Sequence, residues 1–271
     1  MTPSTNVAEH ELQRGAGRPA LFYRVSGEGR PVLLIHGVGA DGGSWTPIAA
    51  ALAGSFRVLW PDLRGHGRSG PIRDPITLDS FVEDVLDVMD AEGVGCADVV
   101  GFSLGGMIAQ ALALDHPARV DRLVIVSAVA GRTEDERARV RSRLEILRNA
   151  GIGAITGAAQ DRWFSDAFLA AHPERVAERM AQLKANDPES YKAAYTVFST
   201  SDLGDRLHGI AHPTLVVTGE HDIGSNTRMA RFMRDQIAGA QLEILPGLKH
   251  SVLVEAPQRI AELTEIFLCR S

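Results

Sequence analysis

Short runs of apolar and β-branched residues alternate along the chain with longer stretches in which apolar residues recur every three to four positions. The short runs predict strands at residues 20–25, 31–35, 56–60, 97–101, 120–127, 214–218 and 241–245. The longer stretches predict helices at residues 45–53, 76–92, 104–116, 228–237 and 257–268, and Ser44 is expected to cap the first of them. This alternation indicates an α/β fold with a mostly parallel sheet covered by helices on both faces.

The alternation stops between residues 131 and 208, where only helical patterns are found. A segment of this length is too long for a loop, so it predicts a helical cap, with residues 1–130 and 209–271 forming the α/β core. The first cap helix, expected at residues 133–149, is rich in arginine. Its arginines form a solvated face that pairs with nearby acids, or one of them faces a pocket and binds an anionic substrate.

Composition and charge exclude several classes of function. The net charge is -6 and no basic stripe is present, so a nucleic-acid partner is not expected. The apolar runs are too short to cross a bilayer, which argues against a membrane partner. Residues 1–10 contain no apolar stretch, so we expect no secretory signal and a cytoplasmic location.

No pattern in the sequence predicts a metal or a cofactor. The two cysteines, Cys96 and Cys269, cannot complete a four-thiolate metal site. The histidines and acids lack the spacing of known metal-binding motifs, and the chain has no dinucleotide or phosphate-binding fingerprint. The expected partner is therefore a small-molecule substrate alone.

A candidate nucleophile lies in the segment Gly-Phe-Ser-Leu-Gly-Gly at residues 101–106, between a predicted strand and a predicted helix. A tight turn of this kind is expected to hold Ser103 in a strained and exposed conformation, with glycines where a side chain would clash. A second glycine-rich turn follows the strand at residues 31–35. The backbone N–H groups of Val38 and Leu104 are the candidate oxyanion hole, whereas His36 is expected to form hydrogen bonds within its turn.

The serine needs a base, and His250 is the candidate among nine histidines because it follows the last predicted strand. Asp222, just after the strand at residues 214–218, is the candidate acid that orients this base, and Glu220 is its nearest rival. We expect His66 to have a structural role in its turn. Four residues near these motifs are candidate substrate contacts, with core packing as the alternative for the aromatic ones. They are Trp45, Phe102, Arg162 and Trp163.

The order Ser103, Asp222, His250 and the motifs around them resemble the α/β-hydrolase superfamily over residues 21–267. The segment at residues 62–69 is also typical of that superfamily. Residues 162–168 and 172–176 resemble the 3-oxoadipate enol-lactonase branch. The resemblance implies the α/β-hydrolase fold, with a cap inserted after the sixth strand, a Ser/His/Asp triad and no cofactor. That branch opens a lactone to give a dicarboxylic acid.

These observations predict a serine hydrolase that cleaves a small ester, lactone or related acyl substrate through an acyl-enzyme, with a carboxylate-bearing catabolic intermediate as one possibility. Ser103 at the turn argues against the dehalogenases and epoxide hydrolases of this fold, which use an aspartate there. Two enzymatic alternatives stay open, namely a carbon–carbon bond hydrolase of ring-cleavage products and a cofactor-free perhydrolase. Outside the enzymes, the alternative is a ligand receptor with an inactive triad.

Overall fold

A computed structural model describes residues 6–15 and 17–270. The expectation of no secretory signal in residues 1–10 therefore falls partly, at residues 1–5, outside the described residues. The centre of the molecule is an eight-stranded sheet in the order β1-β2-β4-β3-β5-β6-β7-β8. The strands are β1 (Ala8–Leu12), β2 (Leu21–Ser26), β3 (Arg30–Ile35), β4 (Phe56–Pro61), β5 (Ala97–Phe102), β6 (Val120–Val126), β7 (Thr214–Gly219) and β8 (Gln241–Leu245). From β4 to β8 every neighbouring pair is parallel, which confirms the predicted sheet.

The sequence analysis missed β1. This edge strand pairs antiparallel with β2, which in turn pairs antiparallel with β4. Its sequence, Ala-Glu-His-Glu-Leu, is mostly exposed, and of these residues Leu12 packs partly buried against the core. One partly buried leucine in five residues is too weak a pattern for hydrophobic periodicity to detect.

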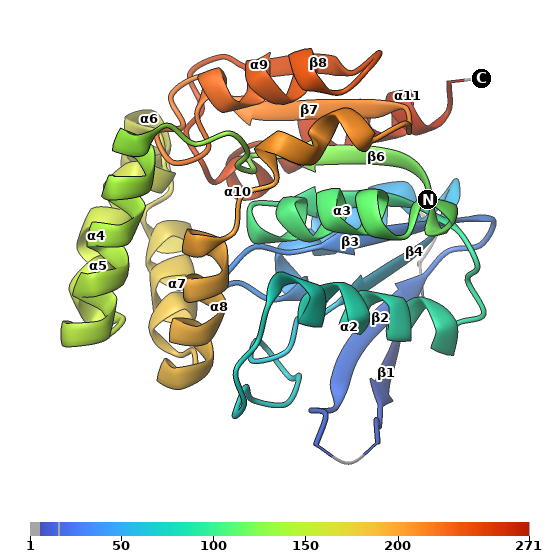
Figure 1. Ribbon diagram of the computed structural model, residues 1–271, viewed down its shortest axis with the longest axis horizontal. Helices are drawn as coiled ribbons and strands as arrows, with labels where there is room; N and C mark the ends of the chain where they lie inside the picture. Colours follow the sequence, from blue (N-terminus) through green and yellow to red (C-terminus); the bar gives the residue numbers. More distant parts are fainter. Residues whose placement is uncertain (1–5, 16, 271) are drawn as a thin grey trace.

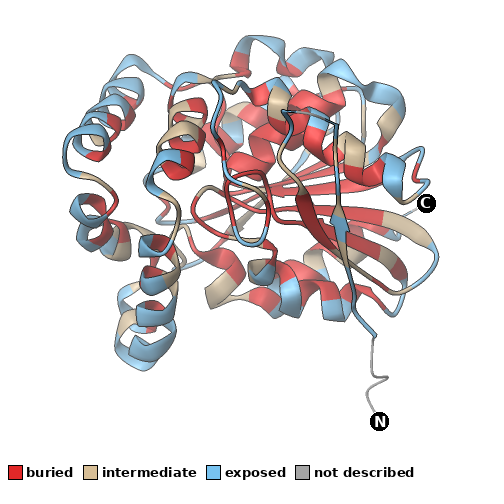
Figure 2. Ribbon diagram, turned by 90° about the horizontal axis from the view of Figure 1, so that it is seen from below, coloured by how far each residue is buried: buried red, intermediate tan, exposed pale blue. Residues whose placement is uncertain are grey.

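Helices cover both faces of the sheet, and most residues of the central strands between them are buried (Figure 1, Figure 2). On one face α1 (Thr46–Leu52) packs against α11 (Pro257–Leu268) over an apolar cluster that includes Trp45 and Trp60. On the other face lie α2 (Leu78–Ala91), α3 (Leu104–Asp115) and α9 (Thr227–Gln236). All but the last two residues of α3 are buried, because it packs against β5 and β6 at the centre of this layer.

The start of the first helix differs from the prediction. Ser44 does not cap α1, whose N-cap position is held by Trp45 without a side-chain hydrogen bond. Asp41 caps the turn before it, because its carboxylate accepts a hydrogen bond from the Gly43 N–H at 2.8 Å. The chain then forms a short 3₁₀ turn at Gly42–Trp45, and α1 begins only at Thr46.

Five helices lie between β6 and β7 and gather beyond one end of the sheet (Figure 1). They are α4 (Glu134–Ala150), α5 (Gly153–Trp163), α6 (Asp166–Ala171), α7 (Pro173–Lys184) and α8 (Pro188–Thr200). The short helix α6 was not predicted. Two small apolar clusters hold these helices together, separate from the two clusters that flank the sheet. The limits of the cap at residues 131 and 208 stay a prediction.

In the part of the chain that the structure describes, three 3₁₀ turns and one short helix complete the connections. They are η1 (Gly42–Trp45), η2 (Pro117–Arg119), η3 (Gly204–Gly209) and α10 (Val252–Glu255). Across residues 6–15 and 17–270, no helix is both long enough and apolar enough to cross a membrane.

Candidate active site

Ser103 lies in the sharp turn between the end of β5 and the first residue of α3. Its backbone has φ 55° and ψ −114°, a conformation that residues with a side chain rarely adopt. The predicted strain is therefore present. The predicted exposure is wrong, because Ser103 is only 4% exposed and lies in a cavity that cap residues help to enclose. A turn motif alone does not reveal what later segments of the chain place above it.

Two glycines allow this turn to pack against the sheet. A Cβ on Gly101 would lie 2.2 Å from the carbonyl oxygen of Gly105. A Cβ on Gly105 would lie 2.1 Å from the carbonyl oxygen of Ile35, at the end of β3. Because both contacts are with backbone atoms, no side-chain rearrangement could relieve them. The sequence requires glycine at these positions because β3, β5 and α3 meet here without space for a methyl group.

The turn that follows β3 packs directly against the serine, since a Cβ built on Gly37 would lie 3.0 Å from the Ser103 Cβ. Within the described residues, the N–H groups of Val38 and Leu104 donate no hydrogen bond to another protein group. Val38 lines the cavity, whereas the side chain of Leu104 is buried in the core. Both N–H groups are thus free to bind an oxygen atom beside Ser103.

His36 anchors this turn. Its Nε2 accepts a hydrogen bond from the Leu63 N–H at 2.9 Å, and its Nδ1 lies 2.8 Å from the Gly37 carbonyl oxygen, to which it donates. Complete burial lowers the pKa of His36. Burial also lowers the pKa of the neighbouring His66 to about 3. Both rings are therefore neutral structural groups near pH 7, as expected from the sequence.

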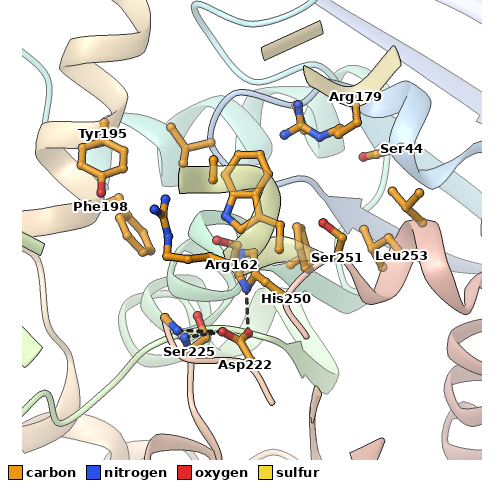
Figure 3. Close-up of a pocket in the computed structure, with 18 of the residues that line it drawn as sticks. Ser44, Arg162, Arg179, Tyr195, Phe198, Asp222, Ser225, His250, Ser251 and Leu253 are labelled. Atoms are coloured by element: carbon orange, nitrogen blue, oxygen red, sulfur yellow. Dashed lines mark hydrogen bonds and ion pairs between the residues drawn. The ribbon is translucent and has the colours of Figure 1, made fainter. Parts of the chain in front are cut away.

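Asp222 and His250 form a hydrogen-bonded pair in the loops that follow β7 and β8 (Figure 3). The distance from His250 Nδ1 to Asp222 Oδ2 is 2.7 Å. The other carboxylate oxygen, Oδ1, accepts hydrogen bonds from the N–H groups of Gly224 at 2.8 Å and Ser225 at 2.9 Å. Asp222 is 3% exposed, so these bonds fix the direction of a buried carboxylate.

The rival acid, Glu220, points elsewhere. Its side chain is half exposed, and its carboxylate accepts a hydrogen bond from the Gly247 N–H at 2.9 Å. The sequence favoured Asp222 and left Glu220 as its rival, because both lie in the same loop. The structure brings only Asp222 into contact with His250.

Ser103, Asp222 and His250 line one cavity of about 80 Å³, whose wall is mainly apolar. They come from the carboxyl ends of three different parallel strands, which meet at the same edge of the sheet. Within the described residues no hydrogen bond of 3.5 Å or less joins the serine to the histidine. Such bonds are often long in the absence of substrate and shorten when it binds.

Three of the four predicted substrate contacts line this cavity, namely Phe102, Arg162 and Trp163. The ring centroid of His250 lies 5.1 Å from that of Phe102 and 6.3 Å from that of Trp163. The expectation for Trp45 is wrong. Its side chain is completely buried in the apolar cluster beneath α1, because the 3₁₀ turn directs it toward the sheet instead of the cavity.

Two further cap arginines line the cavity, Arg143 on α4 and Arg179 on α7. Arg143 belongs to the arginine-rich helix for which a pocket-facing arginine was one of the two interpretations, whereas Arg179 was not singled out from the sequence. Arg179 donates a hydrogen bond to the Gly39 carbonyl at 2.9 Å, and its guanidinium lies 5.0 Å from the centroid of the Trp163 ring. Burial lowers the pKa of Arg179 to about 10. A signal existed in the sequence, because each arginine lies three residues after a buried valine and four before a buried leucine, on the apolar face of its helix.

The loop that carries His250 is bonded to the cap on both sides of the histidine. Lys249 Nζ donates to the carbonyl oxygen of Asp161 at 3.0 Å and pairs with the Asp166 carboxylate at 2.9 Å. The Ser251 N–H donates to the Trp163 carbonyl oxygen at 2.8 Å. Further along, the Glu255 carboxylate accepts hydrogen bonds from the backbone and side chain of the residue that caps α6. The position of His250 therefore depends on the docking of the cap.

The described residues contain no cluster of three or more His, Cys, Asp or Glu side chains arranged to hold a metal ion. The titratable side chains that line the cavity are those of the His–Asp pair, three arginines and two tyrosines, and they lie around the Ser103 hydroxyl. The arrangement can bind a carbonyl carbon next to a serine hydroxyl and move a proton through an oriented imidazole.

Comparison with known proteins identifies the family and the fold. A family model described as the alpha/beta hydrolase fold matches residues 30–257. The 3-oxoadipate enol-lactonase 1 of Acinetobacter baylyi is 30% identical over 92% of this chain and 92% of its own length. The (E)-2-((N-methylformamido)methylene)succinate hydrolase of the same organism is 27% identical, covering 95% of this chain and 97% of the relative. The crystal structure of the enol-lactonase from Burkholderia xenovorans has a TM-score of 0.87 at 30% identity, covering 93% of this chain and 97% of that one.

Proposed function

The chain belongs to the alpha/beta hydrolase fold family, and we propose that it is a serine hydrolase that cleaves a small ester or lactone through an acyl-enzyme. One observation carries the proposal. A serine at a strained turn shares a small cavity with a hydrogen-bonded His–Asp pair and with two free backbone N–H groups. Each of these groups has a defined role in acyl transfer.

In the first half of the reaction, the Ser103 oxygen attacks the carbonyl carbon and its proton moves to Nε2 of His250. Asp222 holds the Nδ1 proton of the imidazole, so that Nε2 is the basic nitrogen, and stabilises the imidazolium that forms. The N–H groups of Val38 and Leu104 bind the oxyanion of the tetrahedral intermediate, a contribution of about 3 kcal/mol per donor in comparable enzymes. The bond to the leaving oxygen then breaks, and that oxygen takes the proton from His250.

In the second half, a water molecule attacks the acyl-enzyme while His250 removes one of its protons. Collapse of the second intermediate releases the carboxylic acid and returns the proton to Ser103. With a lactone the leaving oxygen stays attached to the acyl chain, so a single hydroxy or oxo acid leaves the site. Neither half requires a metal or a cofactor.

The names of the two curated relatives support a substrate that itself carries a carboxylate, because 3-oxoadipate and the substituted succinate are both dicarboxylic acids. Arginines on the cavity wall are the groups of this chain that can bind such a charge, and Arg162 and Arg179 both line it. A small, mainly apolar cavity agrees with a compact acyl group at the serine.

The test compares the wild type with Ser103→Ala and with Ser142→Ala, a matched control at an exposed position on α4. We expect Ser103→Ala to fold normally and to lose at least about a thousandfold in kcat on a p-nitrophenyl ester. A fluorophosphonate probe should label the wild type and the control but not Ser103→Ala. Near-normal turnover by Ser103→Ala would refute the assigned nucleophile, and a wild type that the probe leaves unlabelled would favour a non-catalytic receptor.

A further inference from the structure

A second and larger cavity adjoins the one that contains Ser103. It occupies about 410 Å³ between α4 and the loop that follows β7, compared with about 80 Å³ around the serine. Arg143, Arg162 and Phe198 line both cavities, as do Asp222 and Gly224. A substrate with a longer acyl chain can therefore extend from the serine past these shared residues into the second cavity.

The acids on the wall of the larger cavity are already paired. Glu136 binds the Arg228 guanidinium at 2.6 Å and accepts a hydrogen bond from Asn226 at 2.7 Å. Those bonds lower the pKa of Glu136 to about 2, against the effect of its burial. Asp222 is held by His250 and by two backbone N–H groups. Neither carboxylate is therefore available to neutralise a further cation in the cavity.

Four arginines line the larger cavity, namely Arg132, Arg139, Arg143 and Arg162. Arg143 and Arg162, the two that also border the smaller cavity, form no ion pair with an acid of the described residues. Arg143 donates one hydrogen bond, from Nε to the Tyr195 hydroxyl at 3.2 Å. Within the described residues Arg162 forms no ion pair and its side chain donates no hydrogen bond, while Arg143 forms no ion pair. Burial and the charge of Arg143 lower the pKa of Arg162. An anion placed between these two guanidinium groups would relieve their repulsion and satisfy their donors.

Resting on the proposed hydrolytic function, we infer that the larger cavity is the subsite for a carboxylate tail of the substrate, bound by Arg143 and Arg162. The scissile carbonyl lies at Ser103, and the linker to the carboxylate passes the Phe198 ring, which borders both cavities. Tyr195, Phe198 and Arg162 lie on the same side of the site, away from Arg179 and Ser44 (Figure 3). The planar guanidinium groups suit a carboxylate because each can donate two parallel hydrogen bonds to it.

The experiment compares two series of p-nitrophenyl esters. One series contains monoesters of straight-chain dicarboxylic acids of increasing length, and the other has acyl chains of equal length that end in a methyl group. At the length that lets the carboxylate reach the arginines, we expect the wild type to prefer the anionic ester by about 10- to 100-fold in kcat/KM, the effect of one or two hydrogen bonds to a charged group.

The variants Arg143→Gln and Arg162→Gln should each lower this preference ratio by tenfold or more. Lysine at either position should restore part of the ratio, because it keeps the charge but not the paired donors. The matched control is Arg141→Gln, an exposed arginine of α4 that pairs with Glu134 and does not line either cavity. The control should keep the wild-type ratio.

A wild type without preference at any chain length would overturn the subsite, and so would an equal loss of preference in the Arg141→Gln control. The wild-type comparison alone decides the question if a glutamine variant fails to fold. A different result would refute the proposed function, namely hydrolysis of both ester series that persists in the Ser103→Ala variant. Ser103-dependent hydrolysis of both series with equal kcat/KM overturns the subsite and leaves the proposed function standing.

Discussion

Replacement of Asp222 by asparagine tests whether the buried carboxylate sets the tautomer of His250. The two backbone N–H groups of Gly224 and Ser225 point at Oδ1, so the amide oxygen of asparagine should take that position. The amide NH₂ then replaces Oδ2 and faces the Nδ1 atom of His250. Since a donor now meets this nitrogen, the imidazole must carry its proton on Nε2, where it cannot accept the proton of Ser103.

The size of the effect follows from the hydrogen bonds that hold the amide. Reversing the amide would lose two bonds at about 1 kcal/mol each and leave donors facing donors. A difference of at least about 2 kcal/mol keeps all but a few per cent of the molecules in the inactive tautomer. The corresponding change in a serine protease lowers kcat by about 10⁴-fold, or about 5.4 kcal/mol of transition-state stabilisation. We expect a loss of 10²- to 10⁴-fold here.

The assay is steady-state hydrolysis of a p-nitrophenyl ester near pH 7, together with the rate of fluorophosphonate labelling. Both rates should fall in Asp222→Asn, whereas KM should change little because the cavity keeps its shape. The matched control is Glu220→Gln, which makes the same chemical change in the same loop at a carboxylate that does not contact His250. An Asp222→Asn variant with more than about a tenth of wild-type kcat, or a Glu220→Gln variant that loses as much as Asp222→Asn, would refute the reasoning.

Three further predictions concern the stability of the fold. Gly105→Ala should abolish folding or lower the free energy of unfolding by at least about 3 kcal/mol, because its Cβ would lie 2.1 Å from a backbone oxygen. The control Gly95→Ala, whose Cβ would meet nothing within 4 Å, should unfold near the wild-type temperature. Burial raises the pKa of Asp98 to about 6 from 3.8, against the effect of the Arg30 guanidinium 2.9 Å away. The native state therefore keeps a proton that the unfolded chain releases, and stability falls as pH rises between these values. Urea unfolding from pH 3.5 to 7 should therefore show wild type losing up to about 3 kcal/mol relative to Asp98→Asn, and parallel pH curves would contradict this. Glu255→Ala should lower the free energy of unfolding by about 1–2 kcal/mol and speed proteolysis in α6, because the Glu255 carboxylate binds the residue that caps that helix. Unchanged proteolysis would refute that role.

Much of the fold could be predicted from the sequence because its signals are local. Alternating apolar runs and helical periods located seven of the eight strands and the helices that flank the sheet. The glycines around Ser103 indicated the strained turn, since only a turn packed against backbone needs glycine at both Gly101 and Gly105. The order of serine, aspartate and histidine then identified the superfamily, because each lies after a strand whose carboxyl end reaches the same edge of a parallel sheet.

Contacts between distant segments decided the rest. The edge strand β1 is defined by its pairing with β2, and Ser103 is buried in a cavity that residues of the later cap helices help to enclose. The direction of a side chain also depends on how its helix or turn packs against the rest of the molecule. Trp45 therefore points into the core and Arg143 lines the cavity. Periodicity specifies which face of a helix is buried. The packing of the cap on the sheet decides whether that face contacts the apolar core or lines a cavity.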